Sequence, residues 1–582
     1  MQAPYLTAPA SSNDPATPPP ARRAWWGVAT ALALSGLLLG ITGCASLPSG
    51  VDRPVTTALA SNADTSLGQA VAARAAKAGT KNDSGFALVS SAELAFTSRM
   101  TLIKAAQKTL DLQYYAILAD DTTDRLFDAL REAGNRGVRV RILLDDFNTA
   151  GKNAQVLKLA FEHNIEMRLF NPLPSGRGSA LFRIISSLKD TARLQRRMHN
   201  KIFVADNAVA ITGGRNLGET YFGQSQGTNF VDVDILAAGR MARDLSRSFD
   251  QYWNNPLAYP VPSLVTLADL EALQALDRPT APTPSPASGP ARGAPAASAP
   301  ELLAASDTSV ARTVTLPGGA TTTLPALPDE TNLRLLTWTW APSVMLVDKA
   351  SKIAADADAV EQAQDTTVDG LLQLMSGAQS DLLVVSPYFV PGELMMKQFA
   401  DLRQRGVRVR VLTNSLASND APAAHVGYAR YREALLAMGV DLYEMRAEQA
   451  TSLSSFGSGT GLGSGSAGGS TGASRASLHA KVVVIDARLL VVGSMNLDLR
   501  SKLQNSEVAI VINNRALSLE ATRLIEPALA KGAYKVERVD GQLVWRAPEG
   551  SGLGDSTSEP DASAALKIVL KLIGPFAPEE ML

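Results

Sequence analysis

The segments "RMHNKIFVADNAVAITGGRN" (197–216) and "SLHAKVVVIDARLLVVGSMN" (477–496) align over their whole length without a gap. His, Lys, Asp, Gly and Asn recur at the same offsets, and each residue of the second copy lies 280 positions after its counterpart, as His479 does after His199. The chain has four histidines, and two of them occupy this pair of equivalent places. The pair indicates an internal duplication in which each half of the chain carries one copy of the same unit.

Each copy has the pattern of a β-hairpin with polar side chains at one end. Residues two apart on a strand share a face, so His199 projects with Lys201, and His479 with Lys481. The apolar runs IFVA and VVVI carry the strand into a core, the following Asp begins a tight turn, and a return strand leads to Gly and Asn. Each half is therefore predicted to present an imidazole, an ammonium and a carboxamide near a common point.

This set of groups, present twice, suits the cleavage of a phosphodiester. Two lysines and two asparagines can hold the oxygens of an anionic tetrahedral group without a metal ion. One neutral histidine can attack, and the other, when protonated, can donate to the leaving oxygen. Lysine is a poor metal ligand and the spacing is not that of a zinc site, so we predict no metal and no cofactor. Neither copy contains a Gly-x-Ser-x-Gly motif, so a nucleophilic serine is not suggested.

A second repeat lies upstream in each half and predicts the fold class. "RGVRVRILLDDF" (136–147) matches "RGVRVRVLTNSL" (405–416), and each follows a stretch with helical spacing that itself follows a short apolar run. Gly137 and Gly406 stand where a helix would end and a strand begin. The order strand, helix, strand indicates a βαβ unit in each half, and so an α/β protein.

Bulk composition limits the classes of function. A chain of 582 residues can form two or more domain cores. The formal net charge of −1 excludes a globally basic surface for long nucleic acids, and we expect no nucleic-acid partner. Cys44 is the one cysteine, which excludes an intrachain disulfide framework and a cysteine-rich metal site.

The twin H-x-K-x4-D motifs, each followed by G-(G/S)-x-N, resemble those of the phospholipase D superfamily over roughly residues 90–260 and 335–525. Within it, "GGRNLGETYF" (213–222), "FVDVDI" (230–235) and "HVGYARYREALLAMGVDLYEMR" (425–446) resemble the cardiolipin-synthase branch that lacks an N-terminal hairpin of membrane helices. The resemblance implies two α/β domains related by a pseudo-twofold axis, each a mainly parallel mixed sheet flanked by helices, with the active site at their interface. It also implies exchange through a covalent phosphohistidine.

The resemblance assigns roles to individual residues. His199 and His479 would be nucleophile and acid/base, in an order left open, and Lys201, Lys481, Asn216 and Asn496 would bind the phosphate. Asp206 and Asp486 would support the site by ion pairing and hydrogen bonding. Glu507 would orient a histidine, with Asp232 as its counterpart, and the two copies differ at Gly214 and Ser494. His425 either contacts substrate or simply caps or solvates a helix.

Four functions are compatible with these residues. The leading one is a cardiolipin synthase-like phosphatidyltransferase acting on phospholipids, with an alcohol or a lipid as acceptor. Hydrolysis by a phospholipase D shares the first half-reaction and is not separated from transfer by the sequence. A nuclease-type phosphodiesterase is disfavoured by the near-neutral charge. A non-catalytic lipid-binding scaffold is disfavoured by the two intact motifs.

The N-terminal segment has the pattern of a lipoprotein signal. Arg22 and Arg23 precede an apolar run that ends in small residues at Cys44, and Ile41 to Cys44 resembles the bacterial lipobox. We expect lipidation of Cys44 and a protein that faces the periplasm, at the outer membrane rather than the inner one, because Ala45 follows the cysteine. An uncleaved membrane anchor is the alternative. The oligomeric state is left open.

Composition shifts predict the following organisation, given as residue ranges: signal peptide 1–44, flexible linker 45–85, first phospholipase D-like domain 86–276, Pro/Ala-rich linker 277–330, second domain 331–546 with a disordered Gly/Ser insertion at 454–474, and a tail 547–582 with an amphipathic C-terminal stretch.

Overall fold

The computed structural model describes a defined part of the chain, namely residues 47–80, 83–174, 177–179, 191–225, 227–276, 312–315, 321–324, 330–354, 365–447 and 475–573. The predicted signal peptide with Cys44 and the Gly/Ser insertion at 454–474 lie outside these residues. Of the predicted linker 277–330, the described part includes a hairpin of β10 (Arg312–Thr315) and β11 (Thr321–Leu324).

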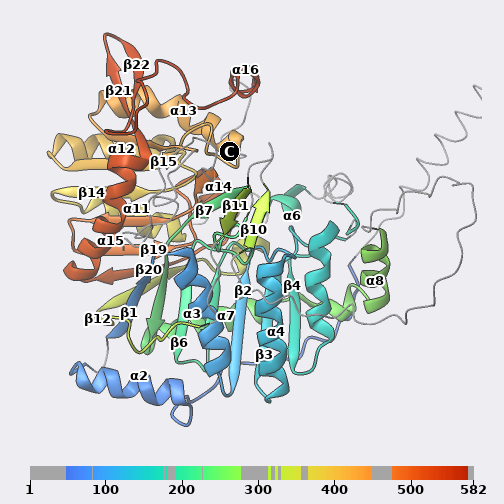
Figure 1. Cartoon of the computed structure of the whole chain (residues 1–582). Helices are drawn as coiled ribbons and strands as arrows, with labels where there is room; N and C mark the ends of the chain where they lie inside the picture. Colours follow the sequence, from blue (N-terminus) through green and yellow to red (C-terminus); the bar gives the residue numbers. More distant parts are fainter. Residues whose placement is uncertain are drawn as a thin grey trace, which may run out of the picture. The chain divides into compact units, whose positions relative to one another are not determined.

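Two nine-stranded sheets, one from each half of the chain, repeat the same strand order (Figure 1). The first sheet contains, in spatial order, β12 (Thr339–Ala341), β1 (Ser84–Val89), β8 (Asp234–Ala238), β6 (Val209–Gly213), β5 (Ile202–Ala205), β2 (Thr109–Tyr114), β3 (Arg139–Asp145), β4 (Ile165–Phe170) and β9 (Ala258–Pro260). The second contains β13 (Ser343–Val347), β20 (Val508–Asn513), β19 (Leu489–Gly493), β18 (Val482–Ile485), β14 (Asp381–Val385), β15 (Arg408–Asn414), β16 (Asp441–Met445), β21 (Ala533–Val539) and β22 (Gln542–Arg546). From β1 to β9 and from β13 to β21 the two orders correspond strand by strand.

The predicted two-domain mixed α/β fold is confirmed, but the parallel part of each sheet is smaller than expected. Only β2, β3 and β4 run parallel in the first sheet, and only β14, β15 and β16 in the second. Every other pair within the two sheets is antiparallel, because the motif segments form hairpins, β5–β6 and β18–β19, that pair with β2 and β14. The βαβ repeats predict the parallel strands and the motif hairpins predict the antiparallel ones.

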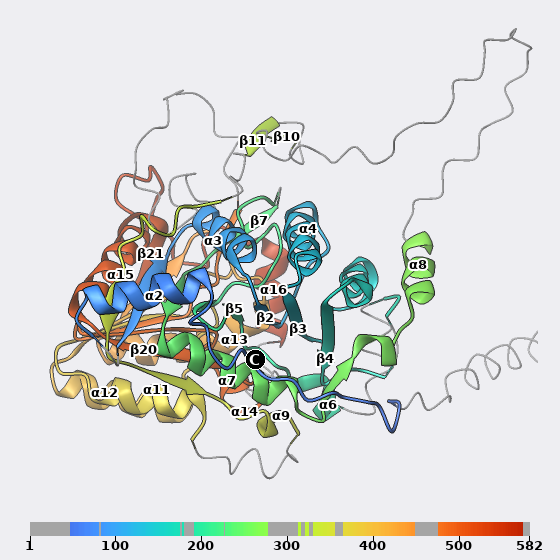
Figure 2. The same cartoon turned by 90° about the horizontal axis from the view of Figure 1, so that it is seen from below.

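Helices cover both sheets. On the first half these are α2 (Ser66–Lys77), α3 (Ala92–Ala105), α4 (Asp121–Asn135), the 3₁₀ segment η1 (Gly151–Phe161), α6 (Thr191–Gln195), α7 (Arg240–Trp253), η2 (Val261–Ser263) and α8 (Leu267–Leu276). On the second half they are α9 (Ser351–Ala354), α11 (Thr367–Ser376), α12 (Gly392–Gln404), α13 (Pro422–Ala437), α14 (Leu499–Leu503), α15 (Arg515–Pro527), the π-helical turn η4 (Ala528–Gly532) and α16 (Ala564–Ile573). Figure 2 shows α3 and α4 on one side of the first sheet and α7 on the other.

Helix α4 illustrates how local sequence directs these elements. The Asp120 side chain accepts a hydrogen bond from the Thr123 backbone N–H, and the Thr123 hydroxyl accepts one from the Asp120 backbone N–H, which is a capping box. Leu126, Phe127 and Leu130 are buried and follow helical spacing, so one face of α4 packs on the sheet. The same arrangement of cap and apolar stripe begins α11, where Thr366 is the cap.

The two halves share one apolar core. It contains inward side chains of both sheets, such as Val204 and Val484, together with residues of α7 and α15. One further apolar cluster lies on the outer side of each sheet. A joint core of this kind holds the halves in one relative position, because separating them would expose the whole buried face to water.

Two predicted boundaries are corrected. Residues 47–80 are not a flexible linker, because the stretch before α2 is bound to the first half: the Arg168 guanidinium donates to the Pro54 carbonyl at 2.6 Å, and Arg141 to the Thr56 carbonyl at 2.9 Å. The second domain does not begin at 331, because β12 pairs with β1 of the first sheet and the chain enters the second sheet at β13. Ser556 of the predicted tail pairs with Trp545 of the second domain, and α16 forms where the apolar pattern predicts a helix.

Candidate active site

Main-chain pairing between the two halves brings each motif histidine beside an acid of the other half. Strand β7 (Thr228–Val231) pairs in parallel with β17 (Arg475–Leu478), with Val231 opposite Leu478, so the next residues, Asp232 and His479, are neighbours. On the other side Met198 forms a parallel bridge with Ser506, which makes His199 and Glu507 neighbours. The exchange is reciprocal, and each His–acid pair therefore contains one residue from each domain.

Side-chain hydrogen bonds complete both pairs. The His479 Nδ1 atom lies 2.7 Å from an Asp232 oxygen, and His199 Nδ1 lies 3.0 Å from both oxygens of Glu507. The four side chains are buried, with the two carboxylates fully so. Because each Nδ1 is engaged by a carboxylate, each Nε2 is the ring nitrogen left for substrate. The prediction that Glu507 orients a histidine, with Asp232 as its counterpart, agrees with this geometry.

The difference within the two G-(G/S)-x-N motifs, Gly214 against Ser494, matches the difference between the two acids. A Cβ atom on Gly214 would lie 2.4 Å from an Asp232 oxygen, so this short carboxylate occupies the space of a side chain. Ser494 instead donates its hydroxyl to the longer Glu507 at 2.5 Å. Glycine with aspartate and serine with glutamate are thus two alternative ways of fixing the same carboxylate position.

The carboxylates of the two His–acid pairs have pKa values that are shifted in opposite directions. Burial raises the pKa of Glu507 to about 7, against the charge of Lys201 and the hydroxyls of Ser494 and Ser501. Burial also acts against ionisation of Asp232, but the hydrogen bond from His479 and the charge of Lys481 together lower the pKa of that carboxyl.

Both imidazoles are held towards the neutral form. Burial, followed by the charges of Lys201 and Lys481, lowers the pKa of His199 well below its usual value. Burial and Lys481 also lower the pKa of His479, where Asp232 acts in the opposite direction. His479 is therefore the easier of the two to protonate.

The two lysines stand beside their histidines with few partners of their own. Lys201 Nζ donates to the His199 carbonyl at 2.7 Å, and Lys481 Nζ donates to the His479 carbonyl and lies 3.1 Å from its Nδ1 atom. Burial lowers the pKa of Lys201 to about 7 and that of Lys481 to about 8. Buried ammonium groups without a full set of acceptors attract an anion, because an anion restores the lost solvation.

The two asparagines follow the hairpins as predicted, and their amides are used differently. The Asn216 Nδ2 group donates to the Tyr221 hydroxyl at 3.0 Å, and its Oδ1 accepts from the Ala116 backbone at 3.2 Å. Asn496 is 4% exposed, and within the described residues its Oδ1 atom has no hydrogen-bond partner. Only the second copy therefore retains an unused acceptor.

Asp206 and Asp486 were predicted to support the site by ion pairing and hydrogen bonding, and their hydrogen bonds go to backbone groups at the far end of each hairpin. Asp206 accepts hydrogen bonds from the backbone of Gln107, Lys108 and Thr109. Asp486 does the same for residues 379–381. Four strand residues lie between each lysine and its aspartate, which places the two about 16 Å apart along the chain. They fix the hairpin turn, whose residues have positive φ, and the start of the neighbouring strand.

His425 is a structural residue of the second half. It is 1% exposed on α13, and its Nε2 atom contacts Arg432 at 3.1 Å and Glu559 at 3.3 Å. Its ring packs on Tyr428 at 5.6 Å. In place of the possible substrate contact, the structure shows His425 in a buried ion-pair cluster that fastens Glu559 to α13.

Aromatic and charged residues around the histidines were missed by the sequence analysis. Tyr115 packs edge-on against His199 at 5.0 Å, while Tyr221 and Phe230 pack against His479 at 5.3 and 4.9 Å. The charge of Arg500 acts on His199, and that of Asp420 acts on His479. Tyr221 and Phe230 lie in segments that the motif comparison had quoted, but Arg500 and Asp420 carry no repeat signal.

No metal centre is indicated. Within the described residues, no group of three or more His, Cys, Asp or Glu side chains is arranged to hold a metal ion. Asp145 and Asp146, which follow one another at the end of β3, bond instead to Arg197 and to Thr149 and Arg177.

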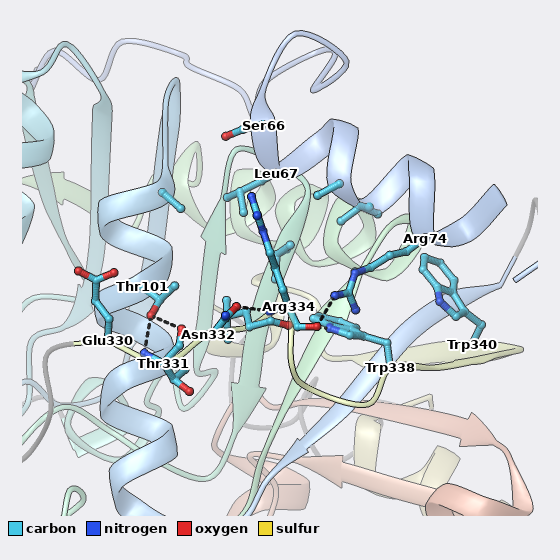
Figure 3. Close-up of a pocket in the computed structure, with 16 residues that line it drawn as sticks. Ser66, Leu67, Arg74, Thr101, Glu330, Thr331, Asn332, Arg334, Trp338 and Trp340 are labelled. Carbon is cyan, nitrogen blue, oxygen red and sulfur yellow. Dashed lines mark hydrogen bonds between the residues drawn. The ribbon is translucent and has the colours of Figure 1, made fainter. Parts of the chain in front are cut away.

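A separate hollow of about 440 Å³ lies between α2, α3 and the segment before β12 (Figure 3). It is lined by apolar side chains including Leu67, Val71, Trp338 and Trp340, and Arg74 crosses it to bond the Arg334 carbonyl at 2.8 Å. It borders the start of β6 and the end of β8, whereas the motif residues lie at the opposite ends of these strands. None of the predicted site residues lines it.

The fold and the site together define a class of protein: an enzyme built from two duplicated α/β domains that acts on phosphodiester bonds. A family model described as "Cardiolipin synthase, PLD-like domain" matches residues 100–253 and 371–527. Cardiolipin synthase C of Escherichia coli is 35% identical over 460 residues, which is 78% of this chain and 86% of that protein. An uncharacterized Helicobacter pylori protein is 30% identical over 82% of this chain and 85% of its own length.

Among solved structures, phosphatidylserine synthase of Haemophilus influenzae has the same fold, with a TM-score of 0.51 and 13% identity over 88% of this chain and 99% of that one. The chain therefore belongs to the phospholipase D superfamily, in its cardiolipin-synthase branch. Among the described residues, no helix has the length and apolar character needed to span a bilayer.

Proposed function

We propose that this phosphatidyltransferase of the phospholipase D superfamily transfers a phosphatidyl group from a donor phospholipid to the hydroxyl group of a second lipid or alcohol, with cardiolipin as the expected product. The observation that carries the proposal is the reciprocal pairing of His199 with Glu507 and of His479 with Asp232 across the two halves. A two-step displacement at phosphorus uses one histidine as nucleophile and another as acid and base, and the two His–Lys–carboxylate sets supply both.

His199 is the nucleophile in this proposal. Its pKa lies well below the usual value because of burial and the two lysines, so the ring is neutral at physiological pH and Nε2 keeps its lone pair. Glu507, bonded to Nδ1, holds the ring in the tautomer with the proton on Nδ1. The attack of Nε2 on phosphorus forms a phosphohistidine and expels the alkoxide of the donor's head group.

His479 is the general acid. Ionised Asp232 at 2.7 Å stabilises the imidazolium form, and the protonated Nε2 can then donate to the departing oxygen. Lys201, Lys481 and the two asparagine amides hold the non-bridging oxygens, where negative charge develops in the transition state. In the second step neutral His479 accepts the proton of the incoming hydroxyl as its oxygen displaces His199 from phosphorus.

The test is an assay of the purified chain with radiolabelled phosphatidylglycerol and, separately, phosphatidylethanolamine, with and without EDTA. Cardiolipin is the expected product, and activity should survive EDTA. Phosphatidic acid alone would assign hydrolysis instead of transfer, and a strict metal requirement would contradict the two-histidine mechanism.

The roles of the histidines are tested by His199→Ala and His479→Ala. Each variant should lose at least about a thousandfold in turnover. Acid-labile label should be found on His199 in the wild type after rapid quenching and peptide mapping. Label on His479 would reverse the two roles.

We also propose that the chain is held at a membrane by a lipid on Cys44 and faces the periplasm. Support comes from the sequence alone: two arginines, an apolar run and the sole cysteine at a lipobox-like junction. A membrane-held enzyme would meet phospholipid substrates in two dimensions instead of from solution.

A further inference from the structure

The two halves of the site differ at their rims although their motifs are alike. The repeat that aligns Arg136 with Arg405 places Asp420 at the position of Gly151 in the first half. The equivalent bridges Ile117–Leu217 and Phe389–Leu497 place Tyr388 at the position of Ala116. The second half therefore carries a phenol and a carboxylate where the first half has an alanine and a glycine.

These two added side chains form a pair on the His479 side of the site. The Tyr388 hydroxyl donates to Asp420, with its oxygen 3.0 and 2.9 Å from the two carboxylate oxygens. Asp420 is exposed, and its charge acts on both His479 and Lys481. The carboxylate thus stands at the open edge of the site, close enough to influence the groups that would activate an acceptor.

The neighbouring asparagine has an unused acceptor at the same place. Phe389 and Leu497 are partners in a parallel bridge, so the residues before them, Tyr388 and Asn496, lie side by side. Asn496 Oδ1 is buried and has no partner among the described residues, whereas Asn216 Oδ1 is satisfied. A buried carbonyl of this kind is completed by a donor from a ligand.

The side of the site around His199 is influenced by a positive charge instead of a negative one. There His199 packs against Tyr115, and the positive charge of Arg500 acts on both of these rings. Hydrogen-bond acceptors and a carboxylate surround one histidine, and a guanidinium acts on the other. A phosphate-bearing donor suits the side of Arg500, while a molecule rich in hydroxyl donors suits the side of Asp420.

We propose that Asp420, Tyr388 and Asn496 form the acceptor subsite beside His479, and that Asp420 selects a neutral polyol, such as a glycerol group, over a simple alcohol or water. A carboxylate can accept from two neighbouring hydroxyls at once, which a mono-alcohol cannot match. An ammonium group at the same place would meet the charge of Lys481. This inference rests on the proposed function, because it concerns the second half-reaction of that chemistry.

The step is a displacement at phosphorus. The acceptor's reacting oxygen forms a bond to phosphorus while the bond from phosphorus to His199 Nε2 breaks, and the electron pair of that bond returns to the imidazole. His479 Nε2 takes the hydroxyl proton. The neighbouring hydroxyl of the polyol donates to Asp420 and is unchanged by the reaction, so its contribution is to hold the reacting oxygen in line.

Competition between acceptors tests the proposal independently of the first step. The full-length chain is given a phospholipid donor in mixed micelles together with isotopically labelled glycerol and 1-propanol, and the two phosphatidyl alcohols and phosphatidic acid are measured by mass spectrometry. All products arise from one phosphohistidine, so their ratio reports only on acceptor selection. In Asp420→Asn the ratio of labelled phosphatidylglycerol to phosphatidylpropanol should fall about tenfold.

Two further variants define the role. Tyr388→Phe should shift the same ratio in the same direction but less, because the carboxylate remains. Asp401→Asn, which removes an exposed carboxylate on α12, is the matched control and should leave the ratio at the wild-type value. An unchanged ratio in Asp420→Asn would overturn the proposal. Ethanolamine is added as a third acceptor. If Asp420→Asn lowers the share of phosphatidylethanolamine but not the share of phosphatidylglycerol, the assignment to a neutral polyol is overturned.

Failure of the proposed function gives a different result. If the wild-type chain forms neither phosphatidyl alcohol, it is not a transferase and both ideas are wrong. If the wild type forms both products and every variant forms them in the same proportion, transfer stands and only the acceptor subsite is rejected.

Discussion

At the scale of single residues, the site depends on how burial shifts the pKa values of its ionisable side chains. His199 and Lys201 lie among groups that lose solvation on folding, and the pKa of each moves towards its neutral form. In the proposed mechanism this gives an uncharged nucleophile. It also leaves two lysines, Lys201 and Lys481, that regain their charge most readily when an anion is present. Substrate binding and lysine protonation are therefore coupled.

This coupling predicts the pH dependence of anion binding. The pKa of Lys201 is about 7 and that of Lys481 about 8, and only the protonated lysine binds an anion well. Sulfate keeps a constant charge from about pH 6 to about pH 9. The thermal stabilisation given by sulfate should thus be greatest below about pH 7 and decline as pH rises through both values. A pH-independent shift in Tm would contradict this, and Lys201→Met should flatten the curve.

A second residue-scale prediction concerns the absence of a side chain at Gly214. The Gly214→Ala variant should lose at least about tenfold in activity, because a Cβ atom would displace the Asp232 carboxylate from His479. Gly227→Ala is the matched control, since its nearest contact would lie at 3.8 Å. Turnover and Tm of both variants are the measurements. Equal activities would show that the Asp232 position tolerates movement.

At the scale of elements, the hairpins β5–β6 and β18–β19 carry the motif, and each is fixed at both ends by different means. One end is held by pairing with the other half, through β7–β17 and the Met198–Ser506 bridge. The far end is held by Asp206 or Asp486, which accepts backbone hydrogen bonds from the adjoining strand. The aspartate of each motif therefore fixes the position of the hairpin, while the histidine and lysine carry the chemistry in the proposed mechanism.

This separation of roles predicts that the two aspartates affect stability. Asp206 is fully buried and accepts from three backbone groups, so Asp206→Ala should lower the free energy of unfolding by about 2–4 kcal/mol. Asp486→Ala should cost less, because Asp486 is only partly buried and water can replace its contacts. Denaturant unfolding measures both. A larger loss from Asp486→Ala would contradict this interpretation.

At the scale of the whole molecule, the duplication produces one site from two incomplete ones. Each half supplies a histidine and a lysine but lacks the acid that its own histidine needs, and the shared core between the sheets holds the two sets in register. A single half would expose that core and leave both acids without their imidazoles. In the proposed acceptor subsite, the difference between a donor side and an acceptor side comes from rim residues that the duplication does not repeat.

The proposed anchor is also a property of the whole molecule. Cys44→Ser should move the protein from the membrane fraction to the soluble fraction of cells, since several acyl chains are needed for stable anchoring. Fractionation with immunoblotting and metabolic labelling with a fatty acid are the measurements. Retention of the variant in the membrane fraction would favour an uncleaved anchor instead.

The sequence by itself determined the repeat, the α/β class and the identity of the histidines, lysines and asparagines, because these follow from spacing along one chain. Glu507 and Asp232 were also within its reach, as family positions. The exchange of those acids between halves was decided only by the tertiary structure, since it depends on strands more than 240 residues apart lying parallel. The positions of Asp206 and Asp486 were also decided by the tertiary structure. Both belong to the H-x-K-x4-D motif, but they lie at the other end of the strand from the histidine and lysine. Two copies of "HxK" predict the chemistry, and the packing of the two sheets decides which carboxylate serves which imidazole.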